Sequence, residues 1–306
     1  MNTYMPAVAT SILAMISACP PTPTESVTPD EGGTSDAPAP AASRSPECGP
    51  EVRGAAALTG PGSILLVGEM HGTVQVPELV GRIACHAARR PQAAVILGLE
   101  ISSDDQPVID AYLASDGGEA AVDTLLAAPH FVADTKDGRS SQAMAELLTT
   151  VRVWRSAGAA IEIACFDAAP GVAKTAAERD AAMAKTLAAV HRERPDATLV
   201  ALSGNVHNRT VPGVPWDPAF VPMGVHLREA FPKLVSLDFR SAGGTFWACM
   251  GTPGGESKCG VAESGGEDRG AEPFVELLAA RDDKGFDGVL YAGTTTASEP
   301  WVAAKG

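Results

Sequence analysis

The sequence predicts an α/β fold with a mainly parallel central sheet and helices on both faces. Three observations carry this prediction. From residue 48 onward, strand-like and helix-like runs alternate, the strand-like runs are almost continuously apolar, and polar residues gather at their carboxyl ends. Alternating elements are typical of βαβ units with a parallel sheet. Continuous apolarity is typical of strands that are covered on both faces.

The apolar patterns place the expected elements along the chain. Strands are expected at residues 64–67, 93–101, 160–167, 197–202, 234–239 and 287–293. Apolar residues recur at helical spacing over 76–87, 144–154 and 176–192. Pro77 falls in the first turn of the first of these helices, where a helix tolerates proline.

Composition describes a globular chain and argues against one class of partner. The chain has 306 residues, is 45% hydrophobic and carries a formal net charge of -14. A nucleic-acid-binding protein needs a clustered basic surface, and the sequence contains no run rich in Lys or Arg. We therefore expect no nucleic-acid partner.

The N-terminus has the pattern of an export signal. Residues 7–18 form a small apolar stretch that is too short for a membrane span. Residues 16–19, Ile-Ser-Ala-Cys, resemble a bacterial lipobox, which predicts a signal over 1–19 with lipid on Cys19. Met1–Pro6 lacks the usual basic residues, so a plain cleaved signal or a mis-assigned start codon is the alternative. The lipobox reading predicts a lipid-anchored protein of the bacterial cell envelope that faces the periplasm or the exterior.

A linker and a single domain are expected after this signal. Residues 20–47 are rich in Pro, Thr, Ser and Ala and show no apolar periodicity, which is typical of a disordered tether. Residues 48–306 have the length of one domain.

The cysteines fit an exported protein. Cys249 and Cys259 flank a Gly/Pro-rich turn and are expected to form a disulfide. Cys48, Cys85 and Cys165 remain, so at least one of them is expected to be buried and free. The spacing does not identify which.

Polar residues follow the strand-like runs at the points where these runs end. Two of the runs close on the same Gly-x-x-His spacing, at Gly68–His71 and Gly204–His207. Because ligands bind outside the carboxyl ends of strands in open α/β sheets, we expect these strand-end groups to converge. They are Glu69, His71, Glu100, Asp167, Asn205, His207, Asp238, Arg240 and Tyr291. Histidines with carboxylates either exchange protons around a water molecule or bind a divalent metal.

Several of these motifs resemble one superfamily. The stretches "VGEMHGT", "LGLEIS", "KDGRSSQAM", "ERDAAMAKTL" and "LSGNVHNR", within residues 63–210, are similar to the superfamily of erythromycin esterases, TIKI/TraB-type proteins and ChaN-like haem-uptake lipoproteins. "FDGVLYAGTTTASEP" is a weaker match. The resemblance implies the fold and leaves three activities open: metal-free ester hydrolysis, metal-dependent peptide hydrolysis, and haem binding without catalysis.

The resemblance also implies roles for individual residues. His71 corresponds to the general base, with Glu69 orienting it, Glu100 as a second carboxylate, and His207 as an acid, an oxyanion stabiliser or a ligand. Arg139 and Arg209 are candidates for binding an anionic group of the substrate, or else for surface ion pairs. Asp167 and Tyr291 are further candidates for contacting the substrate. Arg179 and Asp180 are expected either to line the pocket or to hold their helix in place.

The sequence therefore predicts a hydrolase acting on an ester, lactone or peptide bond of a small molecule or peptide, through Glu69, His71, Glu100 and His207. A serine hydrolase is not expected, because no Gly-x-Ser-x-Gly elbow is present. The alternative is a haem- or iron-binding lipoprotein, in which Tyr291 is the best tyrosine for ligating haem.

Overall fold

A seven-stranded sheet forms the centre of the fold, in the order β3-β2-β4-β1-β5-β9-β8. The computed structural model describes residues 47–132, 136–251 and 257–301. The described residues all belong to one compact unit, Ser43–Gly306. The expected signal, Cys19 and almost all of the expected linker lie outside the described residues.

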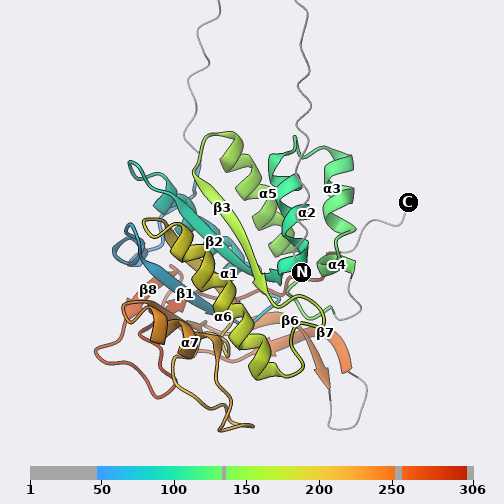
Figure 1. Ribbon diagram of the computed structural model, residues 1–306. Helices are drawn as coiled ribbons and strands as arrows, with labels where there is room; N and C mark the ends of the chain where they lie inside the picture. Colours follow the sequence, from blue (N-terminus) through green and yellow to red (C-terminus); the bar gives the residue numbers. More distant parts are fainter. Residues whose placement is uncertain (1–46, 133–135, 252–256, 302–306) are drawn as a thin grey trace, which may run out of the picture. The chain divides into compact units, whose positions relative to one another are not determined.

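The strands and helices alternate along the chain (Figure 1). The strands are β1 (Ile64–Glu69), β2 (Val95–Ser102), β3 (Ile161–Asp167), β4 (Thr198–Gly204), β5 (Val235–Arg240), β6 (Gly244–Gly251), β7 (Ser257–Ser264), β8 (Phe274–Leu277) and β9 (Gly288–Tyr291). The helices are α1 (Gln75–Ala88), α2 (Gln106–Ala114), α3 (Glu119–Leu126), α4 (Pro129–Val132), α5 (Gln142–Ser156), α6 (Ala176–Glu193) and α7 (Met223–Ala230), with 3-10 turns at Ala55–Leu58 and Ser103–Asp105.

The predicted fold class is confirmed. Six strands of the sheet pair in parallel, and only β8 runs antiparallel, against β9. Each predicted strand and helix has a counterpart in the structure. The prediction did not include α2, α3, α4, α7, β8 or the antiparallel hairpin of β6 and β7.

Two hydrophobic cores explain why the strands are continuously apolar. Leu65 and Val67 of β1 pack on one face of the sheet with apolar residues of α1, α2, α3 and α5. Ile64 and Leu66 point to the other face and pack with α6 and α7. Successive side chains of a strand alternate between the faces, so a strand covered on both sides needs apolar residues at nearly every position.

The cysteines form two disulfides in the described structure. Cys249 pairs with Cys259, as predicted, across the β6–β7 hairpin. Cys48 pairs with Cys85 of α1, which leaves Cys165 as the buried free thiol among the described cysteines. Burial raises the pKa of the Cys165 thiol, so this thiol is not reactive. None of the helices in the described ranges has the length and apolarity needed to cross a membrane.

Candidate active site

The two Gly-x-x-His motifs meet because β1 and β4 are neighbours. The strands pair in parallel with Glu69 opposite Gly204, so the histidines that follow each strand project from the same edge. Gly204 lies between the two rings: a Cβ atom there would stand 3.0 Å from Nε2 of His71 and 3.5 Å from Cδ2 of His207. The glycine therefore makes room for both imidazoles.

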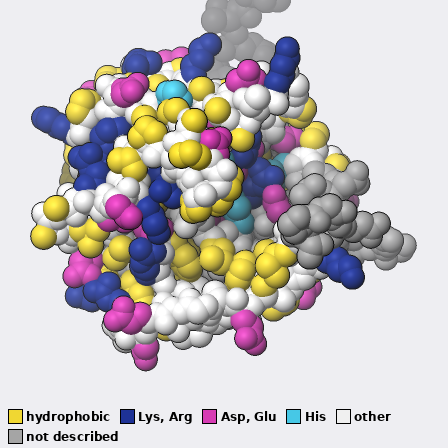
Figure 2. All heavy atoms as spheres, turned by 90° about the horizontal axis from the view of Figure 1, so that it is seen from below, with side chains coloured by type: hydrophobic (Ala, Val, Ile, Leu, Met, Phe, Trp, Pro, Cys, Tyr) yellow, Lys and Arg dark blue, Asp and Glu magenta, His cyan; other side chains and the backbone are white. Residues whose placement is uncertain are grey.

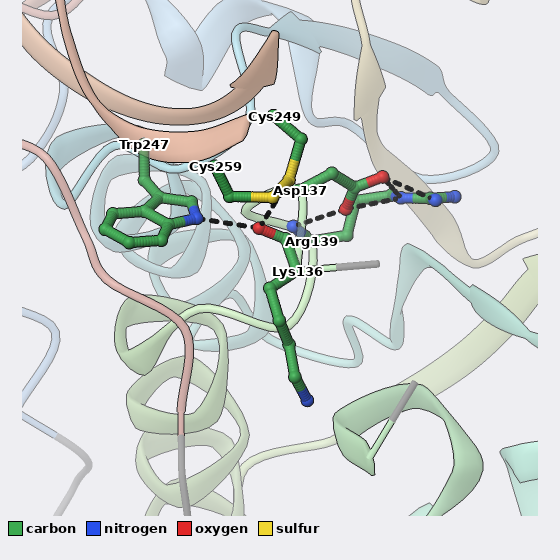
Figure 3. The surroundings of a disulfide bond; sticks show 6 residues. All are labelled: Lys136, Asp137, Arg139, Trp247, Cys249 and Cys259. Atoms are coloured by element: carbon green, nitrogen blue, oxygen red, sulfur yellow. Dashed lines mark hydrogen bonds and ion pairs between the residues drawn. A yellow bond between two sulfur atoms is a disulfide. The ribbon is translucent and has the colours of Figure 1, made fainter. Parts of the chain in front are cut away.

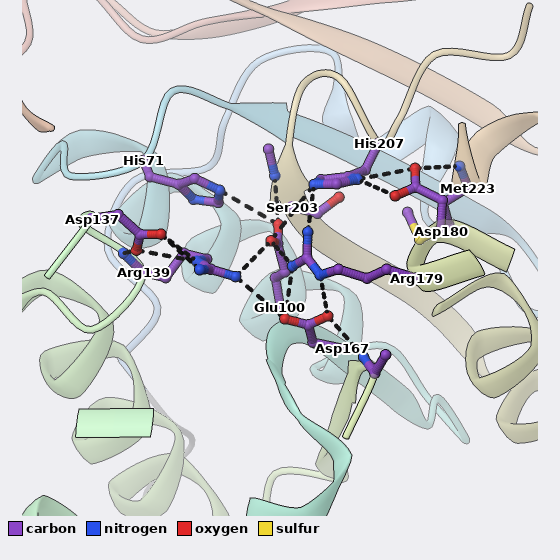
Figure 4. A network of polar contacts seen from close by, with 12 residues as sticks. His71, Glu100, Asp137, Arg139, Asp167, Arg179, Asp180, Ser203, His207 and Met223 are labelled. Atoms are coloured by element: carbon purple, nitrogen blue, oxygen red, sulfur yellow. Dashed lines mark hydrogen bonds and ion pairs between the residues drawn. The ribbon is translucent and has the colours of Figure 1, made fainter. Parts of the chain in front are cut away.

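His71 is held between two carboxylates. Its Nδ1 lies 2.7 Å from Oε1 of Glu69. Its Nε2 lies 3.5 Å from Oε2 of Glu100 (Figure 4). Burial alone would lower the pKa of His71, but the negative charges of Glu100 and Glu69 outweigh it and raise the pKa from 6.5 to about 9. At neutral pH, His71 is therefore an imidazolium in the free protein.

His207 has a carboxylate of its own. Nδ1 of His207 lies 2.8 Å from Oδ1 of the fully buried Asp180. On the other side of the ring, NH1 of Arg179 lies 3.2 Å from Nε2 of His207. Because a guanidinium only donates, this network assigns the proton of neutral His207 to Nδ1. The lone pair of Nε2 then accepts from Arg179, next to Glu100.

Glu100 is the centre of the cluster. Its carboxylate accepts hydrogen bonds from NH2 of Arg179 at 2.6 Å, from NH1 of Arg139 at 3.3 Å and from the backbone N–H of Gly204 at 2.9 Å. Burial opposes ionisation, but the charges of His71, His207 and the two arginines hold the pKa of Glu100 well below its usual 4.5. Glu100 therefore carries a negative charge beside both histidines at neutral pH.

Two aspartates hold the arginines in place. Asp167 binds Arg179 through both oxygens, with Nε–Oδ1 and NH2–Oδ2 distances of 2.7 Å. Arg139 bonds to Asp137 and also lies 3.3 Å from Oδ2 of Asp167. Asp167 therefore holds both guanidinium groups in place, and these groups in turn bind Glu100.

A cleft opens beside the histidines. It has a volume of about 330 Å³ and is lined by Glu69, Met70, His71, Asp137, Gly204, Asn205, Val206, His207, Phe246, Ala248 and Cys249. One wall carries the polar cluster, and the other belongs to strand β6. Figure 2 shows this side of the molecule, where histidine, arginine and acidic side chains gather near the middle with hydrophobic side chains around them. A reacting bond placed in the cleft would lie next to both imidazoles.

The structure brings six of the predicted residues into one network: Glu69, His71, Glu100, Arg139, Asp167 and His207. Arg209 stays outside it. Its side chain makes no ion pair within the described residues, and its Nε is buried without a hydrogen-bond partner there. The expectation that Arg209 forms either a substrate contact or a surface ion pair therefore gains no support from the network.

Tyr291 is also placed outside the cluster, which corrects its expected position. Its side chain is fully buried and stacks on Phe274. The hydroxyl donates to the carbonyl of Gly270 at 3.0 Å and accepts from the backbone N–H of Arg269 at 2.9 Å. The residue is committed to packing β9 against β8, and its hydroxyl is not exposed to a substrate or a haem iron.

The sequence left the roles of Arg179 and Asp180 open. Both residues belong to the site and contact His207, Arg179 at Nε2 and Asp180 at Nδ1. Asp137 was not predicted, although it stands next to Gly138 in a motif that carried the superfamily resemblance. The β6 wall of the cleft was missed as well, because no local pattern indicates which loop covers a strand edge.

The atoms of the cluster that could bind a divalent metal already have other partners. Two guanidinium groups already contact Glu100, and the Nδ1 atoms of both histidines face carboxylates. Within the described ranges, no three His, Cys, Asp or Glu side chains are grouped as a metal site requires. The residues as arranged therefore do not fit a divalent metal.

Solved structures share this architecture. A histidine-to-asparagine mutant of the erythromycin esterase EreC, in its open conformation, superposes with a TM-score of 0.60 at 13% identity, over 78% of this chain and 92% of that one. The chain has the erythromycin esterase fold. A protein from Bacillus cereus matches with a TM-score of 0.50 at 14% identity, over 80% of this chain and 92% of its own.

A haem-binding protein is also among the similar structures, but the likeness is weak. The haem-binding protein ChaN of Campylobacter jejuni gives a TM-score of only 0.33 at 11% identity, over 69% of this chain and 91% of that one. A likeness of this size carries no argument about haem. No protein-family model and no curated sequence matches the chain.

Proposed function

We propose that the protein is a hydrolase that cleaves a carboxylic ester or lactone by general acid–base catalysis. One observation carries the proposal: two histidines, each bonded through Nδ1 to its own carboxylate, turn their Nε2 atoms toward the same ionised Glu100 beside an open cleft. Paired acid–base groups of this kind transfer the protons that ester hydrolysis requires. The likeness of the fold to EreC supports the choice of an ester over a peptide bond.

In this proposal His71 is the general base. Its neutral form takes a proton from water at Nε2, while Nδ1–H donates to Glu69 and the new positive charge is stabilised by Glu100. The hydroxide equivalent adds to the carbonyl carbon and forms a tetrahedral intermediate. When the intermediate collapses, the C–O bond breaks and the alcohol leaves with one proton, so ester and water give acid and alcohol.

His207 is the second acid–base group. Asp180 fixes its Nδ1–H, so Nε2, which accepts from Arg179 in the free protein, is the atom left to exchange a proton with the reacting groups. Arg179 holds both Glu100 and His207 in position. Glu100 favours the protonated form of His71, because its negative charge raises the pKa of that imidazole.

The proposal is tested by a screen of soluble esters, lactones and peptides, followed by variants. His71→Ala and His207→Ala are expected to lower turnover of the accepted substrate by about 10²–10⁴-fold. His226→Ala is the matched control, because His226 lies outside the cleft and should keep wild-type turnover. Wild-type activity in His71→Ala would refute the assigned chemistry.

The screen also separates the hydrolase from the alternative function. If no ester, lactone or peptide is cleaved and the purified protein takes up haem stoichiometrically, the cluster is a binding site. A haem absorption spectrum that weakens in His71→Ala and His207→Ala would identify the same residues as part of that site. Turnover without haem uptake supports the hydrolase.

We further propose that the protein is exported and held in the cell envelope by lipid on Cys19. Two disulfides support export, because such bonds persist in oxidising compartments. Fractionation of cells producing the wild type and Cys19→Ala tests the anchor. Membrane association of the wild type that is lost in Cys19→Ala is the expected result, and equal solubility of the two proteins would contradict it.

A further inference from the structure

The β6–β7 hairpin packs directly on the backbone next to His71. The N–H of Trp247 donates to the carbonyl of Gly72 at 2.9 Å. A Cβ atom at Gly72 would stand only 2.2 Å from the carbonyl oxygen of Trp247, and Gly72 has a φ of 79°. Only glycine permits this conformation and this approach without strain. The hairpin therefore touches the residue that follows the proposed base.

The same tryptophan holds the segment that carries Arg139. The indole Nε1–H of Trp247 donates to the carbonyl oxygen of Lys136 at 2.7 Å (Figure 3). Sγ of Cys249 lies 3.2 Å from that oxygen. Within the same segment, a Cβ atom at Gly138 would stand 2.6 Å from the backbone nitrogen of Gly72. Three segments thus meet next to His71 and Arg139: the backbones of Gly72 and Gly138 approach closely, and Trp247 of β6 binds both sides.

A disulfide fixes the strand that carries Trp247. Cys249, two residues further along β6, is bonded to Cys259, its direct partner on β7. Cys259 is exposed, whereas Cys48 and Cys85 are 3% and 0% exposed. A dithiol therefore reaches the hairpin disulfide and not the buried one. In that reaction the Cys249–Cys259 bond breaks, two protein thiols form, and the dithiol is oxidised to its own disulfide.

We propose that Trp247, fixed by the Cys249–Cys259 disulfide, is a positioning residue. It holds the His71 and Arg139 segments in fixed positions relative to each other. The indole donates to a carbonyl and lies outside the reacting cluster, so it acts through its neighbours. This inference rests on the proposed hydrolase function for its kinetic consequences. The position of Arg139 relative to His71 can be followed without a substrate, because it affects the pKa of His71.

Trp247→Phe tests the proposal, because it removes the indole donor and keeps an aromatic ring. We expect kcat to fall about tenfold or more with a smaller change in KM. The guanidinium of Arg139 lowers the pKa of His71, so release of the Arg139 segment should raise that pKa above its wild-type value in an NMR titration. Trp216→Phe is the matched control, since Trp216 is 73% exposed and should change neither quantity.

The disulfide supplies the second arm of the test. Cys249→Ser with Cys259→Ser, or treatment of the wild type with a dithiol, should shift kcat and the His71 titration in the same direction as Trp247→Phe. Thiol counting by mass spectrometry verifies that the Cys48–Cys85 bond stays intact.

The two readouts keep this inference separate from the proposed function. If the wild type hydrolyses nothing, a raised His71 pKa in Trp247→Phe still supports the positioning role. An unchanged His71 titration overturns it, even if the variant melts at a lower temperature, because a purely structural residue would show only that loss.

Discussion

Both carboxylate oxygens of Asp180 lie at hydrogen-bonding distance from Nδ1 of His207, at 2.8 and 3.0 Å. Asp180 is fully buried in the first turns of α6, and its Oδ2 also accepts from the N–H of Met223 at 2.9 Å, at the start of α7. A helix N-terminus stabilises a negative charge. Asp180 therefore fixes the ring through Nδ1, which leaves Nε2 of His207 directed toward Arg179 and Glu100.

Asp180→Asn is expected to lower kcat by about 10²–10⁴-fold with little change in KM. The asparagine amide can donate to Nδ1, which would move the His207 proton to Nε2 and leave the wrong tautomer in the cleft. Asp180→Glu keeps the charge and should retain more activity. Equal activity of Asp180→Asn and the wild type would show that the tautomer of His207 does not matter.

The pH–rate profile should report His71. Because its pKa is raised to about 9, the neutral form that acts as a base becomes more abundant as the pH rises. We expect kcat/KM to increase from neutral pH and to level off above about pH 9. Measurement of initial rates across this range, with the His71→Ala variant as a blank, checks the assignment. A rate that falls through this range would instead make protonated His71 the active form.

The free energy of unfolding should depend on pH in two windows. The pKa of His71 is raised by folding, so its stabilising contribution is complete below pH 6.5 and is lost as the pH rises through about 9. The pKa of Glu100 is lowered by folding, so its contribution is present above pH 4.5 and is lost as the pH falls below that value. Urea unfolding at several pH values should therefore show highest stability between these windows. His71→Ala should flatten the alkaline decline.

Glu100→Gln should cost both activity and stability. The side chain of Glu100 is 4% exposed and its carboxylate contacts two guanidinium groups. Loss of the charge removes one of the carboxylates that each partly buried guanidinium contacts, a change that costs on the order of 1–3 kcal/mol. Thermal and urea unfolding measure this cost. A stable but inactive Glu100→Gln protein would mean that Asp167 alone satisfies the arginines.

Tyr291→Phe should leave turnover unchanged. The hydroxyl joins the backbone of Arg269 and Gly270, so its removal should lower the free energy of unfolding by about 1–2 kcal/mol. Kinetics and urea unfolding of the same preparation separate the two effects. A large fall in kcat/KM would show that Tyr291 contacts the substrate.

Most of the cluster could be predicted from the sequence, because polar residues at the ends of apolar strands are a local pattern. Apolar runs locate the parallel strands, and His71, Glu100 and Asp167 follow where those runs end. Their convergence is a property of any parallel sheet. The same logic misplaced Tyr291, because β9 is separated from β1 by β5 and its last side chain turns to pack on β8.

The other site features depend on contacts that no local pattern encodes. Asp180 reaches His207 only because α6 packs beside the loop that follows β4. The Cys48–Cys85 pair joins residues 37 positions apart, and the spacing of the three remaining cysteines does not single out that pair. Gly138 was not assigned a role, since the need for glycine there arises from the close approach of the Gly72 backbone.

The Cys48–Cys85 bond also determines how the protein can be handled. Cys85 lies in the last turn of α1, and the chain then leads into the amino end of β2. The described fold is therefore entered at the edge of the sheet opposite the cleft. Glu47, the first described residue, lies there: its carbonyl accepts from the indole of Trp154, near the end of α5. Coupling a resin through Lys258 of the hairpin would instead obstruct the cleft, because β6 of the same hairpin forms one of its walls.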